Sequence, residues 1–389
     1  MKTQGIGRTD RELLVWISWI LLLFAFGLRV CVAYFQPRPN YFWHTDTTAY
    51  WGDAESLLRE GRLSHGAAPP GLAILLVPFV WMKIPAFQVV LVVQSLLGTL
   101  TILLAMRITR YLSNRHAALL CGLILAVYPP LLNLTRQLIT ETWFILFLVL
   151  SVSCLLRDSL LRWFLGGCAA GMACLIRPAA LGVVLFTSCA FVSFRPLRSR
   201  APLYLTGVAA FLLFGTALQS HSAGHLVFFG QTSQTATYKP VWGGYATVDE
   251  AEAMQRGSYL DFLVRSPKQF VTERVISVGT LLSPWPLGSA ERSLSNKLLI
   301  AASDLCVYAL ILWACRRVRR ATWKVETWFL VAPVCGLVTF YGLLFSQPRY
   351  RWPFMPFLVC IVAVVWGNWK AATSGWPGSL RSEDHSDPR

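Results

Sequence analysis

Apolar residues fill most of this chain in unbroken runs of about 20, and short polar segments separate the runs. Such runs predict helices that cross a membrane, because an amphipathic helix or a half-buried strand would alternate with polar positions. We predict an all-α polytopic membrane protein, with about ten transmembrane helices forming a single domain in residues 1–370 and a disordered tail in residues 371–389. The runs lie near residues 13–35, 86–109, 116–134, 140–156, 162–177, 179–194, 202–220, 297–315, 326–345 and 353–369.

The composition supports a membrane protein and excludes other classes. Hydrophobic residues make up 55% of the chain and charged residues only 14%, which lies outside the usual range for soluble domains. The formal net charge of +16 would suit nucleic-acid binding, but Lys and Arg lie in short clusters between apolar runs, so we expect no nucleic-acid partner. All ten Cys residues fall within predicted helices and form no CxxC motif, so we expect them to be reduced and inert.

The basic clusters also predict how the chain lies in the lipid bilayer. They occupy loops at one end of the predicted helices, and cytoplasmic loops carry an excess of Lys and Arg. This predicts both termini in the cytoplasm and the loops 36–85 and 221–296 on the outer side. The clusters are Arg107, Arg110 and Arg115; Arg195, Arg198 and Arg200; and Arg316, Arg317, Arg319, Arg320 and Lys324.

The first outer loop contains the polar stretch "WHTDTTAYWGDAESLLREGRLSHGAAPPG". Asp46, Tyr50 and Asp53 follow helical spacing and share one face of a predicted short helix, which Gly61 would end. Asp46 is either a functional carboxylate or the N-cap of this helix, and we interpret Asp53 as a solvated helix residue. The following segment 69–85 is apolar but interrupted by prolines, so we predict short interfacial helices in this loop.

Three passages in this order resemble a known superfamily. They are "TDTTAYWGDAESLLREGRL" followed by a Pro-Pro pair, "LITETWFILFLVLSVSCLLRDSLLRWFLGGCAAGMACLIRPAALGVVL", and "SQPRYRWPFMPFLVCIVAVV". Together they resemble the polyprenyl-phosphate-sugar-dependent glycosyltransferases of the GT-C superfamily. The nearest branches are those of protein O-mannosyltransferases, aminoarabinose transferases and lipopolysaccharide core transferases. The resemblance covers most of residues 13–370 and implies a GT-C-like fold.

The resemblance implies an inverting glycosyltransferase that moves a sugar from a polyprenyl-phosphate donor to a lipid, glycan or protein hydroxyl. The reaction would occur at the outer face of a bacterial inner membrane or an equivalent lumenal face. The outer loops would bind the acceptor, alone or with a membrane-protein partner. Such a transfer needs a base for the acceptor hydroxyl and cations for the departing phosphate, which guanidinium groups bind well. This resemblance implies that Asp46 is the catalytic base and that Arg349 and Arg351 bind the leaving phosphate. Further candidates for substrate binding are Tyr50, Glu141 and Arg177, which lies at a helix end.

These residues also have ordinary interpretations. Arginine at a helix end often contacts lipid head groups, and an acidic residue in a first helical turn, such as Glu141, is favoured by the helix dipole. His44 and His65 flank Asp46 without a recognised metal-binding spacing, so we expect no metal ion or other cofactor. Where the aminoarabinose branch has a phosphate-binding Lys before the Pro-Pro pair, this chain has Ala68.

Two other functions stay open at this point. A transporter or flippase of a lipid-linked anionic substrate would carry charges at mid-membrane and inverted repeats, whereas the charges here lie mostly at the ends of the predicted helices. A non-catalytic subunit would use Asp46 only as a helix cap. No motif identifies the sugar, the acceptor or the polyprenol length.

Overall fold

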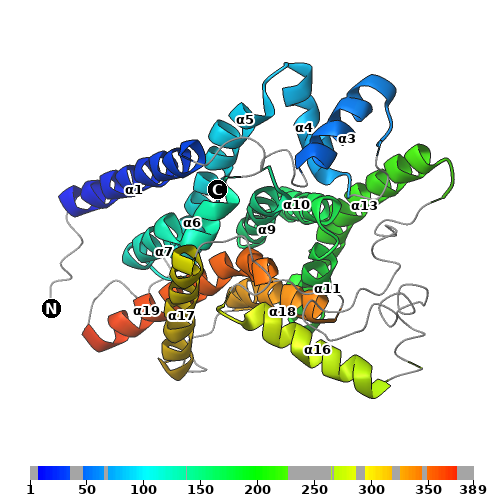
Figure 1. Cartoon of the computed structure of the whole chain (residues 1–389). Helices are drawn as coiled ribbons and strands as arrows, with labels where there is room; N and C mark the ends of the chain where they lie inside the picture. The colour runs from blue at the N-terminus through cyan, green and yellow to red at the C-terminus, as the bar shows by residue number, and fades with distance from the viewer. Residues whose placement is uncertain are drawn as a thin grey trace, which may run out of the picture.

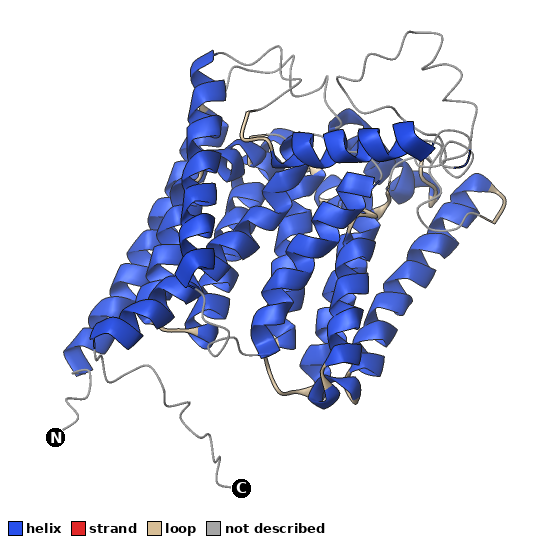
Figure 2. Cartoon of the chain, turned by 90° about the horizontal axis from the view of Figure 1, so that it is seen from below, coloured by secondary structure: helices blue, strands red, loops and turns tan. Residues whose placement is uncertain are grey.

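The computed structural model describes residues 8–35, 47–64, 69–136, 138–226, 264, 267–285, 294–317, 325–343 and 348–374. The regular elements in these residues are helices, and no strand occurs among them (Figures 1 and 2), so the all-α prediction is confirmed. In chain order the elements are α1 (Arg8–Tyr34), α3 (Thr47–Glu60), α4 (Gly71–Trp81), α5 (Ala86–Gln88), η1 (Val89–Gln94), α6 (Ser95–Leu112), α7 (Arg115–Val127), α8 (Pro129–Leu134), α9 (Thr140–Leu155), α10 (Leu160–Ile176), α11 (Ala180–Ser193), α12 (Arg195–Arg198), α13 (Ala201–Ala223), α16 (Pro267–Leu282), α17 (Leu294–Arg317), η3 (Val325–Thr327), α18 (Trp328–Leu343), η4 (Pro348–Phe354) and α19 (Met355–Ser374).

Each predicted apolar run coincides with helix, but the number of about ten spans is not confirmed. By length and composition, five of the described helical stretches are long and apolar enough to cross a membrane, and the other runs form shorter apolar helices. α19 continues to Ser374, so the first residues of the predicted tail are helical, and residues 375–389 lie outside the described part of the chain. The five long stretches are Glu12–Tyr34, Ala86–Leu112, Ala201–Ala223, Lys297–Arg317 and Tyr350–Thr373.

One predicted run is divided by prolines. α7 and α8 are separated at Tyr128, because the Pro-Pro pair that follows has no N–H to donate to the carbonyls four residues earlier. Those carbonyls belong to Leu125 and Ala126, and the Arg29 guanidinium of α1 donates to them instead, at 3.2 and 3.5 Å. The Arg29 side chain is 1% exposed. A buried cation therefore caps the end of α7.

Glycines bring two pairs of helices into backbone contact, and Figure 1 shows the members of each pair near one another. A Cβ on Gly207 of α13 would lie 2.5 Å from the Phe164 carbonyl oxygen of α10. A Cβ on Gly336 of α18 would lie 2.6 Å from backbone atoms of Gly182 in α11. Small residues allow membrane helices this close an approach. We call the α10–α13 and α11–α18 contacts the two glycine seams.

The basic loops meet at one end of the bundle, which we call the basic end. Ser113, between α6 and α7, donates to the Asn368 side chain near the end of α19 at 2.9 Å. The Arg317 guanidinium at the end of α17 lies 5.1 Å from the ring centroid of Trp369. The Arg157 guanidinium, just after α9, lies 5.9 Å from the Tyr111 ring of α6. Because α9 ends and α10 begins here, the start of α9 and the end of α10 lie at the opposite end, the site end.

Candidate functional site

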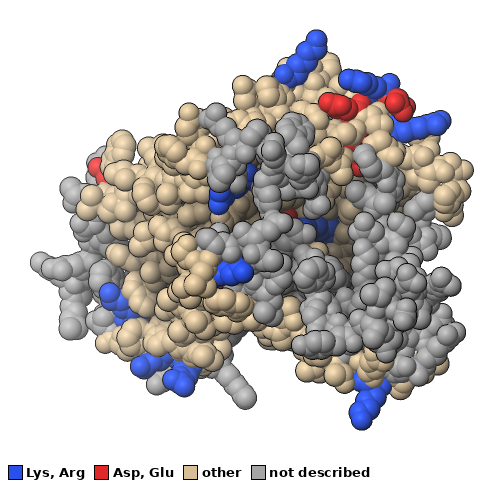
Figure 3. Space-filling view, viewed as in Figure 1, with Lys and Arg blue, Asp and Glu red and all other residues tan. Residues whose placement is uncertain are grey.

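Segments that are distant in the sequence meet at the site end. α3 begins at Thr47, whose buried hydroxyl donates to the Leu138 carbonyl at 3.3 Å, so this helix start lies against the segment leading into α9. α9 then begins at Thr140, and α10 ends at Ile176. The C-terminal turn of α18 and the short helix η4 complete the group. The face shown in Figure 3 is hollowed near its centre, where a basic and an acidic side chain are both visible.

Arg177 connects these segments. Its Nε donates to the Thr140 hydroxyl at 2.6 Å, and its Nη2 forms an ion pair with Glu141 Oε1 at 2.7 Å. Its Nη1 donates to the Tyr341 hydroxyl at 3.4 Å, and its Cζ lies 5.1 Å from the ring centroid of Tyr350. The Arg177 side chain is 14% exposed and that of Glu141 only 1%. Burial is the largest single influence and acts to lower the pKa of Arg177. The Glu141 carboxylate and the neighbouring tyrosine hydroxyls together outweigh burial, so the pKa is raised above its usual value.

Local sequence explains this placement. Arg177 precedes Pro178, which disfavours helical backbone at the residue before it, so Arg177 adopts an extended conformation and ends α10. Its side chain contacts Thr140 and Glu141 at the start of α9. Glu141 lies in the first turn of α9, where the helix dipole favours a carboxylate. Tyr350 stacks on Tyr341 with ring centroids 4.6 Å apart, which packs η4 against the end of α18.

The structure brings three of the predicted site residues together, namely Glu141, Arg177 and Tyr50. Tyr50 is partly buried one turn into α3 and lies near enough to act electrostatically on Arg177. Asp46 immediately precedes the first residue of α3 and lies outside the described residues. The side chain of Arg349 also lies outside them. The assignments of these two residues stay predictions.

Arg351 follows Tyr350 in η4 and is fully buried. Its guanidinium forms an ion pair with Asp304 of α17, in which Nε donates to Oδ2 at 2.8 Å. Its Nη2 also donates to the Pro284 carbonyl at 3.0 Å, and Tyr128 donates a short hydrogen bond to the other Asp304 oxygen. We did not identify Asp304 from the sequence. The available signal was a lone acidic residue within an apolar run, which is rare in membrane spans and usually functional.

The interpretation of Asp53, the second aspartate of the first outer loop, as a solvated residue is wrong. Asp53 is 2% exposed and accepts a hydrogen bond from the Ser64 hydroxyl at 2.8 Å, so it is not a solvated helix residue. The prediction of the helix end is confirmed: α3 stops at Glu60, and Gly61 has a φ of +68°, a conformation that glycine adopts without strain. The chain turns there and brings Ser64 back to the helix, which helical periodicity alone does not reveal.

Within the part of the chain that the structure describes, no three His, Cys, Asp or Glu residues lie close enough together to hold a metal ion. His44, Asp46 and His65 fall outside that part. Our expectation that no metal is needed therefore stays a prediction.

Comparison with known proteins supports the resemblance noted in the sequence. Residues 69–219 match the family model described as dolichyl-phosphate-mannose-protein mannosyltransferase. No curated protein matches the sequence. The matched segment runs from the residues before α4 to Gln219 within α13. It includes both Glu141 and Arg177, whereas the η4 region lies beyond it.

Solved structures share the fold. ArnT from Cupriavidus metallidurans, bound to undecaprenyl phosphate, aligns with a TM-score of 0.55 at 14% sequence identity, covering 92% of this chain and 60% of the other. The oligosaccharyltransferase AglB from Archaeoglobus fulgidus, in complex with an inhibitory peptide and a dolichol-phosphate, aligns with a TM-score of 0.57 at 14% identity, covering 92% of this chain and 50% of the other. The chain thus spans half to three-fifths of the length of these two GT-C proteins. The GT-C-like fold predicted from the sequence is confirmed.

Proposed function

We propose that this chain, which shares its fold with two GT-C structures, is an inverting glycosyltransferase that uses a polyprenyl-phosphate sugar as donor. The acceptor is a hydroxyl group of a lipid, glycan or protein at the outer face of the membrane. The observation that carries the proposal is Arg177, a largely buried cation that Glu141, Thr140 and two tyrosines hold in one orientation at the site end. Support also comes from the two related structures, which were solved with undecaprenyl phosphate and dolichol-phosphate.

The reaction needs one proton acceptor and one or more fixed cations. The acceptor oxygen attacks C1 of the sugar, its proton passes to a carboxylate, and the bond between C1 and the phosphate oxygen breaks with inversion. The polyprenyl phosphate that leaves carries one more negative charge than it had in the donor. A cation that is already oriented stabilises this developing charge without reorganisation during the reaction.

We assign the base to Asp46 and the phosphate contact to Arg177 and Arg349. Asp46 directly precedes α3, whose first residue packs against the segment leading to Glu141 and Arg177. Arg351, which the sequence offered for the phosphate, has its guanidinium engaged by Asp304 and the Pro284 carbonyl, so we give it a different role below.

The test uses the purified protein in lipid nanodiscs with labelled polyprenyl-phosphate sugars as donors. The acceptor is first identified by mass spectrometry of the envelope lipids and glycans that change when the gene is deleted. We expect Asp46→Asn to lower turnover by about 100-fold or more while expression and donor binding are kept. The matched control is Asp158→Asn, because Asp158 is an 80% exposed carboxylate paired with Arg200 at the basic end.

Two outcomes would overturn parts of the proposal. Wild-type turnover in Asp46→Asn would refute the assignment of the base, since Asn is also a good N-cap and preserves the helix start. Movement of the labelled donor across liposomes without any transfer product would favour the carrier hypothesis over the enzyme.

A further inference from the structure

We propose that Asp304 is a positioning residue: through Arg351 it holds η4 so that Tyr350 lies against Arg177. This inference rests on the proposed function, because the segment held in place is the one that faces the leaving phosphate. Asp304 does not touch the substrate on this account. It acts through two consecutive residues of η4 whose side chains have different partners.

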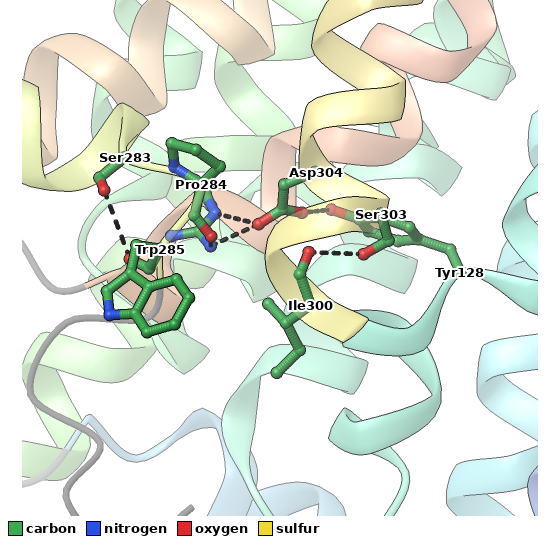
Figure 4. Close-up of polar contacts among 8 residues, drawn as sticks. Tyr128, Ser283, Pro284, Trp285, Ile300, Ser303 and Asp304 are labelled. Atoms are coloured by element: carbon green, nitrogen blue, oxygen red, sulfur yellow. Dashed lines mark hydrogen bonds and ion pairs between the residues drawn. The ribbon is translucent and has the colours of Figure 1, made fainter. Parts of the chain in front are cut away.

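The first half of the argument is the buried cluster around Asp304. Both oxygens of this carboxylate are engaged, one by Tyr128 and the other by Arg351 (Figure 4). Arg351 in turn donates to the Pro284 carbonyl, just after the end of α16. The cluster therefore joins the end of α7, the chain after α16, the middle of α17 and η4, which are four segments far apart in the sequence.

The second half of the argument concerns Tyr350, the residue next to Arg351. Tyr350 precedes Arg351 in η4, stacks on Tyr341 and lies under the Arg177 guanidinium. Tyr341 accepts a hydrogen bond from the same guanidinium. A shift of η4 would therefore disturb the tyrosine stack and remove one side of the Arg177 environment. The Arg351–Asp304 ion pair is a buried polar contact that joins η4 to α17.

Stability alone is a poor explanation for this ion pair. Both side chains are fully buried, and burying two charges costs desolvation that well-packed hydrophobic residues avoid. The Asp304 carboxylate also lies within an apolar stretch, Lys297–Arg317, where charged residues are expensive. The ion pair instead fixes the orientation of the Arg351 side chain, because a guanidinium bound by both a carboxylate and a carbonyl has a single orientation.

The first experiment compares Asp304→Asn with wild type in two measurements. We expect turnover to fall about 10- to 100-fold, with the donor KM changed much less, because misplacement of a group that stabilises developing charge affects kcat most. Binding of undecaprenyl phosphate should weaken, while binding of undecaprenol, which has no phosphate, should stay the same. Asp158→Asn at the basic end serves as the control and should change neither measurement. Equal weakening for both lipids, or unchanged turnover, would overturn the proposal.

The second experiment separates positioning from stability. The double variant Asp304→Leu/Arg351→Met replaces the ion pair with apolar side chains and should recover the thermal stability that Asp304→Asn loses. We expect its turnover and its undecaprenyl phosphate binding to remain low. We also expect faster amide hydrogen exchange in residues 348–354 of both variants. If the double variant regains wild-type turnover, the pair has only a structural role.

These measurements distinguish failure of this inference from failure of the proposed function. If the wild-type protein transfers no sugar but Asp304→Asn still accelerates exchange in η4 and weakens undecaprenyl phosphate binding, the enzyme assignment fails and the positioning role stands. If the wild-type protein is active and Asp304→Asn matches it in turnover, binding and exchange, the enzyme assignment stands and the positioning role fails.

Discussion

Replacing Arg29 with methionine tests whether a buried arginine replaces the hydrogen bonds that prolines remove. In the wild-type protein its guanidinium donates to the carbonyls of Leu125 and Ala126, which have no backbone donor because residues 129 and 130 are prolines. Methionine has a similar length and an apolar character, so Arg29→Met keeps most of the packing. It leaves both carbonyls without a partner in a buried place.

The size of the effect follows from two opposing contributions. Each buried carbonyl that loses its partner costs about 1–3 kcal/mol, so the two together cost about 2–6 kcal/mol. Part of this is recovered, because Arg29 forms no ion pair with any carboxylate in the described part of the chain, and its Nε has no hydrogen-bond partner there. Removing such a charge relieves some desolvation. We expect the free energy of unfolding to fall by about 2–4 kcal/mol.

The measurement is an SDS titration of the protein in mixed micelles, followed by tryptophan fluorescence. Arg29→Met is measured in the wild-type background and with Pro129→Ala, which supplies an N–H four residues after Leu125. The cost should be smaller in the second background, because the new N–H can pair with that carbonyl. Arg110→Met, an exposed arginine near the basic end, is the control and should change stability by less than about 0.5 kcal/mol. Equal costs of Arg29→Met in both backgrounds, or no cost in either, would refute the capping argument.

Two further predictions concern the site and the helix walls. Glu141→Gln removes the carboxylate that pairs with Arg177, and we expect turnover per folded molecule to fall about 10- to 100-fold, with a loss of thermal stability because Arg177 keeps a largely buried charge without its ion-pair partner; an unchanged kcat would contradict this. Gly336→Ala places a Cβ against the backbone of Gly182 and should cost about 1–3 kcal/mol of stability. The control is Gly27→Ala, which should not lower stability because a Cβ there would meet no atom within 4 Å. Equal melting temperatures for the two alanine variants would show that the α11–α18 seam can widen without loss of stability.

The helices could be predicted because the signals for them are local. An apolar run of 19 residues at 297–315 already specifies α17, and a glycine or a proline pair marks where a helix must stop. Gly61 and the break at Tyr128 are such marks, although we identified only the first. The number of spans was harder to predict, because helices of 10–17 residues are too short for length alone to decide.

The site could be predicted only in part, because its contacts are long-range. Arg177 was identifiable as an arginine at a helix end, yet two of the tyrosines around it come from α18 and η4, more than 160 residues later. The pairing of Arg351 with Asp304 has no signature in the sequence, because the residues lie 47 positions apart and on different helices. An arginine near a helix end gives the same sequence pattern whether its guanidinium faces a phosphate, lipid head groups or a buried carboxylate. Burial, which only the folded chain provides, separates these cases.

The two glycine seams limit the route by which a lipid tail can reach Arg177. Where one backbone rests directly on another, no acyl or isoprenoid chain fits between the helices, and separating them would forfeit every van der Waals contact along the seam. The walls α10–α13 and α11–α18 are therefore closed to lateral passage. A polyprenyl chain whose phosphate sits at Arg177 must lie along another flank of the bundle, and lipids photocrosslinked to the protein should label side chains there and spare the seams.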